Sequence, residues 1–428
     1  MQERTRTGHF VFEQVDSPAV GSVLYEQHLS LPSRLHMNPF CGYIMPLWYS
    51  TIATEHRAVR EAAGLFDCTH MGTLDVSGAE ARDFLDYVTT NKIENLGIGR
   101  ARYSYILDAA GNILDDIIIY RRADERFMVV VNAANEPKIK AYFKALLNDE
   151  VPVDAEDIKR KLPYKPDISD MKDASQSRDC RVDIALQGPI SLDIVSALTD
   201  TQAAEQIAAM RPFHFVQAAL SEIDCIIART GYTGSKIGFE LFVHPDYASK
   251  LWEMILQKYE GQGLVPCGLG ARDSLRIEAG LPLYGHELAG QFNISPIEAG
   301  YGWAVKLDKE FFIGKKPMEE IAKNYNMEVA RIELPGEKGV RPVRQNDAVL
   351  NSNGECTGWV LSSAKIEEKQ IALVYMSKEY TEQGSPVGLY YLARSRGQLE
   401  KGRKDRVEKA EHVNPDLAGV VLSRFAKF

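Results

Sequence analysis

Apolar residues recur with helical spacing in several stretches of the chain, and these stretches predict α-helices. Residues 50–64 form one of them, with Ser50 as the candidate N-cap. The segment 77–80, Ser-Gly-Ala-Glu, has the form of a capping box and predicts the start of another helix. The apolar stripe of that helix consists of Ala81, Phe84, Leu85 and Val88.

Short apolar runs bounded by turn residues predict β-strands in the middle of the chain. These runs cover residues 103–107, 114–120, 127–132, 225–229 and 239–244. Residues 167–179 are polar without clear periodicity and predict a loop or an insertion. After about residue 325 the pattern changes to short strands with turns, which predicts a separate β-rich C-terminal domain.

Length and charge narrow the function classes. The 428 residues are enough for about two to three domains. Lysine and arginine number 50 and aspartate and glutamate 59, so the net charge is −9, which argues against a general nucleic-acid binder. No apolar run is long enough to cross a bilayer, so we expect no membrane partner.

Three further features predict a cytoplasmic protein without a metal site. Residues 1–6 are polar and lead into no apolar segment, so no secretory signal is expected. The six cysteines are far apart and form no Cys-x-x-Cys pair, which suggests neither zinc nor disulfides. The histidines form no usual ligand set, and we interpret His70 and His286 as polar packing residues.

The pair Asp115-Asp116 is the first candidate for chemistry. Because side chains alternate along a strand, Asp116 shares its face with Ile118 and Tyr120, while Asp115 points the other way. Both faces carry apolar residues, and a carboxylate buried there is costly unless it is hydrogen-bonded, paired or functional. The alternative interpretation is that both aspartates end the preceding turn and bind backbone amides.

Glu240 is the second candidate carboxylate. It follows the segment 229–234, Arg-Thr-Gly-Tyr-Thr-Gly, whose glycines permit a tight turn or the close approach of a ligand. Its strand neighbours are apolar, and an isolated glutamate is rarely fully buried. A ligand that presents adjacent N–H donors would satisfy it. Alternatively, the segment is a hairpin turn and Glu240 pairs with an arginine.

Arg272 is the third candidate, in the segment 266–280. Asp273 is the candidate cap of a helix that runs to Ala279, and an arginine beside a helix N-terminus is well placed to meet a carboxylate. The alternative is a structural ion pair. The segment lacks the G-x-G-x-x-G and Walker A spacings, and the chain has no G-x-S-x-G elbow that would indicate a hydrolase.

Taken in order, these segments resemble the glycine-cleavage T-protein (aminomethyltransferase) family. The resembling segments are 42–46 with Tyr49, 55–60, 64–67, 70–72, 90–91, 111–116, 131–135, 186–189, 229–234, 268–280, 283–288 and 298–306. The ordered match covers roughly residues 40–316, and the C-terminal third fits more loosely at 358–363 and 371–375.

The resemblance implies an α+β fold, with a three-domain, cloverleaf-like arrangement around a central folate channel. We expect a discontinuous folate-binding domain at residues 1–68 plus 151–290 and an inserted α+β domain at residues 69–150 that carries Asp116. The β-rich C-terminal domain is expected at residues 325–428.

The resemblance also implies roles for individual residues. Asp116 matches the catalytic aspartate beside the folate nitrogens, and Glu240 matches the acid that grips the pterin. The remaining cofactor-binding positions match Tyr103, Tyr120, Asn132, Tyr232 and Arg272. The implied cofactor is tetrahydrofolate, one of whose nitrogens attacks the aminomethyl carbon on the dihydrolipoyl arm of a carrier protein, so that ammonia leaves and methylene-tetrahydrofolate forms.

Two alternatives stay open at the level of sequence. Tetrahydrofolate-dependent demethylases have a similar scaffold and move a methyl group from an O, N or S donor of a small molecule, and a shared fold does not decide between donors. A folate-binding regulatory protein without turnover is another class. The chain departs from the family pattern before Leu24, in a longer segment 151–179, and in a turn at 234–240 that is one residue longer.

Overall fold

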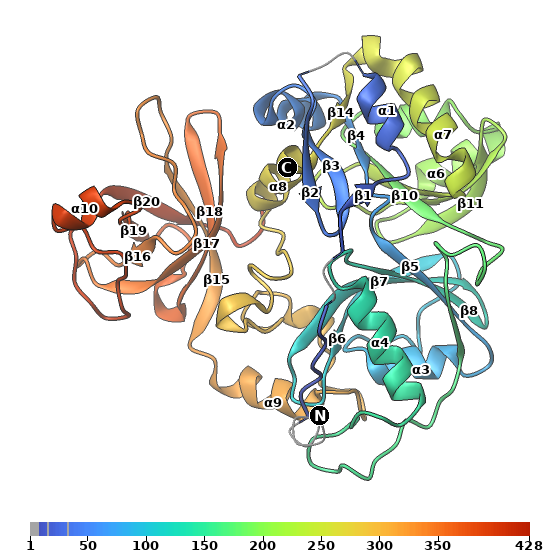
Figure 1. Cartoon of the computed structure of the whole chain (residues 1–428), viewed down its shortest axis with the longest axis horizontal. Helices are drawn as coiled ribbons and strands as arrows, with labels where there is room; N and C mark the ends of the chain where they lie inside the picture. Colours follow the sequence, from blue (N-terminus) through green and yellow to red (C-terminus); the bar gives the residue numbers. More distant parts are fainter. Residues whose placement is uncertain (1–7, 15–16, 32–33) are drawn as a thin grey trace. The chain divides into compact units, whose positions relative to one another are not determined.

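The computed structural model describes residues 8–14, 17–31 and 34–428, so the predicted absence of a signal in residues 1–6 lies outside the described part. The chain forms two compact units (Figure 1). The N-terminal unit comprises residues up to Gly231 with Ser235–Arg272 and Ala304–Glu319. The C-terminal unit comprises Tyr232–Gly234, Asp273–Trp303 and Glu320–Phe428. The predicted division at residues 69 and 150 stays a prediction.

A five-stranded antiparallel sheet carries the Asp115-Asp116 pair. Its order is β6 (Arg100–Leu107), β7 (Ile113–Ala123), β8 (Arg126–Val131), β5 (Gly72–Ser77) and β9 (Asp167–Asp170). Helices α3 (Ala81–Val88) and α4 (Glu136–Leu147) pack on one face, where Phe84, Ile117 and Val129 share a buried core. The first residues of the predicted loop 167–179 form strand β9 instead. This polar segment has no strand pattern of its own, and its pairing with β5 orders it.

A six-stranded sheet forms the second layer of the N-terminal unit. Its order is β11 (Phe215–Leu220), β12 (Ile223–Ala228), β13 (Gly238–Val243), β10 (Val182–Gln187), β4 (Ala63–Asp67) and β14 (Leu264–Cys267). Neighbouring strands are antiparallel except the parallel pair β4 and β14. The apolar core on one face joins the strands to α5 (Ser191–Ser196), α6 (Thr201–Ala209) and α7 (Pro245–Tyr259).

The helix-free faces of the two sheets meet each other. Tyr120 and Met128 of the five-stranded sheet share a buried cluster with Phe215, Ile226 and Phe242 of the six-stranded sheet. The N-terminal unit is therefore layered as helices, sheet, sheet and helices. Side chains that alternate away from the helices point into the space between the sheets, and we call these two surfaces the inner faces.

The C-terminal unit contains a closed β-barrel. Its order is β15 (Met327–Pro335), β18 (Lys369–Ser377), β17 (Cys356–Ile366), β16 (Ala348–Leu350), β19 (Pro386–Tyr390) and β20 (Leu417–Leu422). Ile332, Val374 and Leu389 belong to its buried interior, and closure leaves no unpaired strand edge. The barrel makes the C-terminal part β-rich, as predicted, while the bounds 325–428 stay a prediction. Antiparallel sheets with helices on one face confirm the α+β class.

Shorter elements complete the chain. The strands are β1 (Val20–Gly21), β2 (His36–Phe40) and β3 (Tyr43–Trp48). The helices are α1 (Tyr25–Ser30), α2 (Ile52–Glu61), α8 (Leu269–Ala279), α9 (Lys315–Asn324), α10 (Arg396–Glu400) and the 3-10 turns η2 (Glu260–Gln262), η3 (Gly290–Phe292), η4 (Gly302–Ala304) and η5 (Lys378–Tyr380). In the described part of the chain, no helix combines the length and apolar character needed to span a bilayer.

Three predicted helix starts are wrong by a few residues. Thr51, not Ser50, caps α2, since the Ser50 hydroxyl instead donates to Glu55. Glu80 occupies the N-cap of α3 without a side-chain cap, because its carboxylate accepts the Lys165 amide. Asp273 lies inside α8, four residues after the helix begins. The competing partner is distant in the chain only for Glu80; Ser50 is engaged by Glu55, five residues on, and Asp273 by Arg276 in the same helix.

Candidate active site

Asp116 lies at the start of β7 on the inner face and is partly exposed. The Tyr103 hydroxyl donates to Oδ2 at 3.0 Å, and the Asn132 amide donates to Oδ1 at 2.8 Å. The pairing of β6 with β7 sets Tyr105 opposite Asp116, and the Tyr105 hydroxyl oxygen lies 3.2 Å from the Tyr103 hydroxyl oxygen. Strand register thus surrounds one reachable carboxylate with oriented donors.

Asp115 is fully buried on the opposite face of β7. Its Oδ2 accepts the Asn132 backbone amide at 2.9 Å, and its Oδ1 accepts side-chain amides of Asn132, at 2.8 Å, and Asn135. The Lys138 ammonium in turn donates to Asn135 Oδ1 at 2.8 Å. One side chain, Asn132, therefore joins both carboxylates. The alternative interpretation is wrong about the turn, since both aspartates lie within β7 and Asp108 closes the preceding turn by accepting the Asn112 amide. It is right that Asp115 binds a backbone amide, that of Asn132.

Burial shifts the pKa values of the two aspartates and of the nearby Lys138. Burial raises the pKa of Asp116, although hydrogen bonds from Tyr103 and Asn132 act against this shift. Burial and the neighbouring Asp116 charge raise the pKa of Asp115 to about 8. Burial lowers the pKa of Lys138 to about 8, while the Asp115 charge raises it. At neutral pH the pair therefore carries fewer than two negative charges.

Replacing Asp115 by asparagine is expected to flatten the pH dependence of stability. Because the folded state holds a proton that the unfolded chain has lost, the wild-type contribution falls as pH rises from about 4 to about 8. Asparagine does not titrate in this window. Urea unfolding at several pH values measures the slope, and Asp124→Asn, at the exposed end of the hairpin, is the matched control. An Asp115→Asn slope equal to that of wild type would contradict the expectation.

Glu240 lies on β13 with its side chain on the inner face of the six-stranded sheet. The hydroxyls of Thr230 and Tyr120 donate to Oε2, the latter at 3.2 Å, and Tyr120 is fully buried. The Gln187 side-chain amide holds the backbone on both sides of this turn by donating to the Thr230 and Phe239 carbonyls. A Cβ at Gly231 would come within 2.1 Å of the Gln187 side-chain oxygen, so a larger residue there would displace the amide that binds these two carbonyls.

Arg272 lies in the first turn of α8 and is half-buried. Its Nη1 donates to Cys68 Sγ at 3.2 Å. Burial raises the pKa of the Cys68 thiol well above its usual range, although Arg272 acts in the opposite direction. The thiol is therefore neutral, and Arg272 remains a cation that an anionic or carbonyl-bearing ligand can use.

Six of the seven sequence-predicted site residues belong to the N-terminal unit. Tyr103, Asp116 and Asn132 form one group, and Tyr120 with Glu240 forms another. Asp116 and Tyr120 stand four residues apart on the same face of β7, which separates their Cα atoms by about 13 Å. Tyr232 belongs to the C-terminal unit, where its hydroxyl donates to the Pro282 carbonyl at 2.6 Å, and its role stays a prediction.

The sequence patterns did not identify several residues that lie near the site. Asn135 and Lys138 show only the i, i+3 spacing of a helix start. Asp183 carries the same signal as Glu240, a lone carboxylate in an apolar strand. His70 is buried, but its Nδ1 finds no hydrogen-bond partner among the described residues, so its interpretation as a packing residue stays a prediction. Among the described residues no group of His, Cys, Asp and Glu could hold a metal ion.

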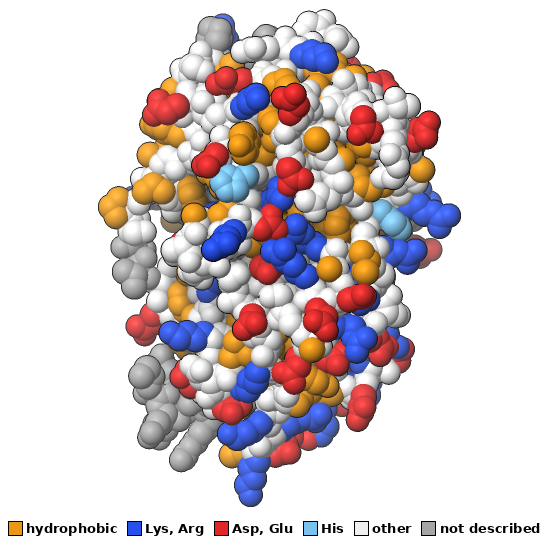
Figure 2. Space-filling model, turned by 90° about the vertical axis from the view of Figure 1, so that its right-hand side faces the viewer, with side chains coloured by type: hydrophobic (Ala, Val, Ile, Leu, Met, Phe, Trp, Pro, Cys, Tyr) orange, Lys and Arg blue, Asp and Glu red, His pale blue; other side chains and the backbone are white. Residues whose placement is uncertain are grey.

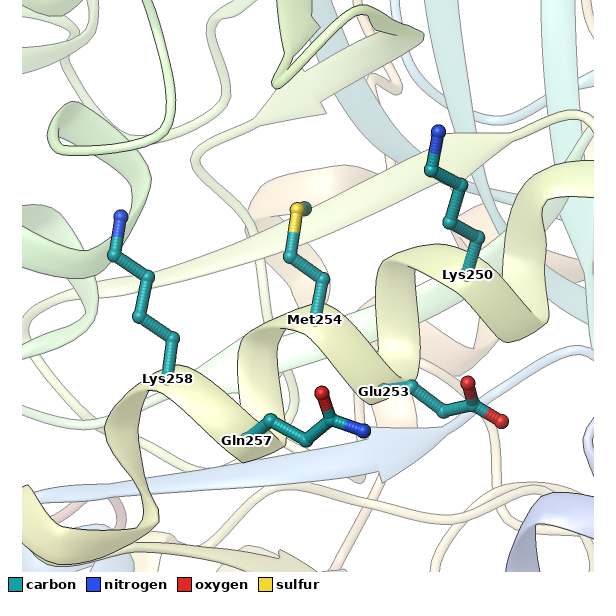
Figure 3. A pocket seen from close by; sticks show the side chains of 5 residues that line it. All are labelled: Lys250, Glu253, Met254, Gln257 and Lys258. Atoms are coloured by element: carbon teal, nitrogen blue, oxygen red, sulfur yellow. The ribbon is translucent and has the colours of Figure 1, made fainter.

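A surface hollow on α7 is separate from these groups. Lys250, Met254 and Lys258 project from one side of the helix, and Glu253 and Gln257 from the other (Figure 3). All of its lining residues lie on a single helix, so it offers no convergent set of groups. On the face of the molecule in Figure 2, acidic and basic side chains are interspersed.

Comparisons with known proteins agree in both sequence and structure. The family model described as "GCVT N-terminal domain" matches residues 24–309. The aminomethyltransferase of Chlorobium chlorochromatii is 38% identical over 350 residues, which are 81% of this chain and 88% of that protein. The aminomethyltransferase of Pelodictyon phaeoclathratiforme is 36% identical over 383 residues, 89% and 96% of the two chains.

A solved structure extends the likeness to nearly the whole chain. The glycine cleavage system aminomethyltransferase T from Bartonella henselae superposes with a TM-score of 0.72 at 27% identity. The superposition covers 94% of this chain and 96% of that one. The likeness therefore includes the β-rich C-terminal part as well as the two-sheet N-terminal unit.

Proposed function

The chain belongs to the aminomethyltransferase family of the glycine-cleavage T-proteins, and we propose that it transfers a one-carbon unit to tetrahydrofolate from an aminomethyl group carried on a lipoyl arm. The observation that supports this best is Asp116, a partly exposed carboxylate held by Tyr103 and Asn132 on an inner face. A carboxylate with oriented donors is suited to electrostatic and proton-transfer roles.

The residues near Glu240 and Arg272 suit a polar, folate-like ring system. Thr69 and His70 directly follow Cys68, the residue that Arg272 contacts. Both are buried, and the Thr69 hydroxyl and the His70 Nδ1 find no hydrogen-bond partner among the described residues. Buried polar atoms are nearly always paired, so we infer that a polar ligand hydrogen-bonds these two atoms.

Tetrahydrofolate, when bound, would supply the nitrogen that receives the carbon. The chain's own work is positioning and charge stabilisation. Asp116 would orient the reacting nitrogen, stabilise positive charge that develops there and accept a proton at its carboxylate. Asn132 would fix the orientation of Asp116, because its side-chain amide donates to both Asp116 and the buried Asp115. Tyr120 and Thr230 would aim Glu240 at ring N–H groups, and Arg272 would offer a cation.

The partners follow from the same proposal. The carrier protein would present the aminomethyl-lipoyl arm, and no nucleic-acid or membrane partner is proposed. Cytoplasmic location also stays a prediction; the described structure adds that its six cysteines are free thiols.

One assay tests the proposed function. The purified protein is incubated with tetrahydrofolate and an aminomethylated lipoyl carrier, while methylene-tetrahydrofolate and ammonia are measured together. Stoichiometric formation of both products is the expected result. No product from this carrier, with tetrahydrofolate binding intact, would contradict the aminomethyl donor. Methyl-tetrahydrofolate from a methylated small molecule would instead indicate a demethylase.

A further inference from the structure

Asp183 is a buried carboxyl group with one oxygen that no described residue hydrogen-bonds. It stands in β10, in the otherwise mostly apolar run Val-Asp-Ile-Ala-Leu of residues 182–186, and is 2% exposed. Its Oδ1 finds no hydrogen-bond partner among the described residues. Burying a polar group without a partner costs free energy, so an unpaired carboxylate in a strand requires an explanation other than packing.

Strand register places Asp183 on the inner face near Glu240. Asp183 lies opposite Phe242, and Ala185 lies opposite Glu240, in the antiparallel pair β10 and β13. Residues two apart share a face, so Asp183 and Glu240 point to the same side as Phe242, which belongs to the cluster between the two sheets. The Cys68 amide donates to the Asp183 carbonyl, which puts the Arg272 contact beside it.

The charges around Asp183 agree with this placement. Burial and the Glu240 charge raise the pKa of Asp183 well above its usual range, and Arg272 acts in the opposite direction. The Glu240 carboxyl group and the Arg272 guanidinium thus both act electrostatically on Asp183.

Asp67, on the neighbouring strand, shows what a structural carboxylate looks like in the same sheet. Its side chain accepts the Ser22 hydroxyl at 2.6 Å and the Thr69 amide at 2.8 Å, and it lies 2.8 Å from His28 Nε2. Although burial opposes the shift, hydrogen bonds and charge from His28 lower the pKa of Asp67 to about 2. Asp67 thus has three hydrogen-bond partners, whereas Asp183 Oδ1 has none among the described residues.

We propose that Asp183 is a further ligand-binding residue of the folate site, whose carboxyl group hydrogen-bonds an N–H group of the bound ring system alongside Glu240. This inference rests on the proposed function and deepens it. Two carboxyl groups on one face match a planar heterocycle that carries more than one N–H donor. In the free protein the Oδ1 atom, which has no partner among the described residues, lowers stability, and the ligand relieves that cost.

Opposite effects on stability and binding test the proposal. Asp183→Leu replaces the carboxyl with an apolar side chain of similar size, and Asp183→Ala removes it without demanding space. Thermal unfolding is measured without ligand, and the Kd for tetrahydrofolate by titration calorimetry. We expect Asp183→Leu to raise Tm and both variants to raise Kd by about three- to tenfold, as for a lost hydrogen bond to a neutral carboxyl group. Asp67→Leu, the matched control, is expected to lower Tm.

The outcomes separate this inference from the proposed function. Wild-type protein that fails to bind tetrahydrofolate would refute both. Wild-type binding that is weakened by Glu240→Gln but unchanged in Asp183→Leu and Asp183→Ala would overturn the role of Asp183 alone. If Asp183→Leu does not fold, the Kd of Asp183→Ala decides. A lower Tm with an unchanged Kd would make Asp183 a structural residue.

Discussion

Asp116→Asn is expected to lower kcat by about 10²- to 10⁴-fold, the usual contribution of a positioned acid or base. Asparagine keeps the shape of the side chain and an oxygen that can accept from Tyr103 or Asn132, so the fold should survive. It loses the negative charge and the ability to take a proton. The KM for tetrahydrofolate should change less than kcat, because the lost interaction strengthens during the reaction.

Steady-state kinetics with the aminomethylated carrier measure this effect. Asp124→Asn, exposed at the end of the same hairpin, removes the same charge without touching the site and should retain wild-type kcat. An Asp116→Asn variant that kept more than about one tenth of the wild-type kcat would contradict a role of Asp116 in the reaction. Tyr103→Phe should give an intermediate loss, since it deletes one donor to Asp116 but leaves Asn132 in place.

Glu287→Ala is expected to destabilise the C-terminal unit by about 3–5 kcal/mol, as when one partner of a buried ion pair is removed. Glu287 and Arg276 are both almost fully buried, and Arg276 Nη1 lies 2.6 Å from Glu287 Oε2. The Leu283 amide also donates to Oε2, and the Ser362 hydroxyl donates to Oε1. Removing the carboxylate leaves the Arg276 charge buried with its main partner gone.

Urea unfolding followed by far-UV circular dichroism measures this loss. The control is Glu400→Ala, which breaks the exposed pair with Arg396 on α10 and should cost less than about 1 kcal/mol. Equal losses of unfolding free energy in the two variants would show that the buried Arg276–Glu287 pair contributes no more to stability than an exposed pair. Glu287→Gln should fall between them, because it keeps the polar contacts but not the charge.

Local patterns predicted much of the fold in this chain. The stripe Ala81, Phe84, Leu85 and Val88 is buried as expected, because helical periodicity alone determines which face meets the core. Alternation in β7 correctly placed Asp115 and Asp116 on opposite faces, with Tyr120 on the face of Asp116. Helix starts were less predictable, since Glu55 and the Lys165 amide take the groups that local capping would use.

The sequence by itself determined the periodicities, the α+β class, the β-rich C-terminal part and the family resemblance, because each depends on residues close together in the chain or on ordered motifs. Only the tertiary structure decided which groups meet. Tyr120 reaches Glu240, and Arg272 reaches Cys68, across long stretches of chain. Such contacts depend on sheet order and strand register, which bring inner faces together and which no local pattern encodes. The same packing left Asp183 Oδ1 without a partner inside the described protein.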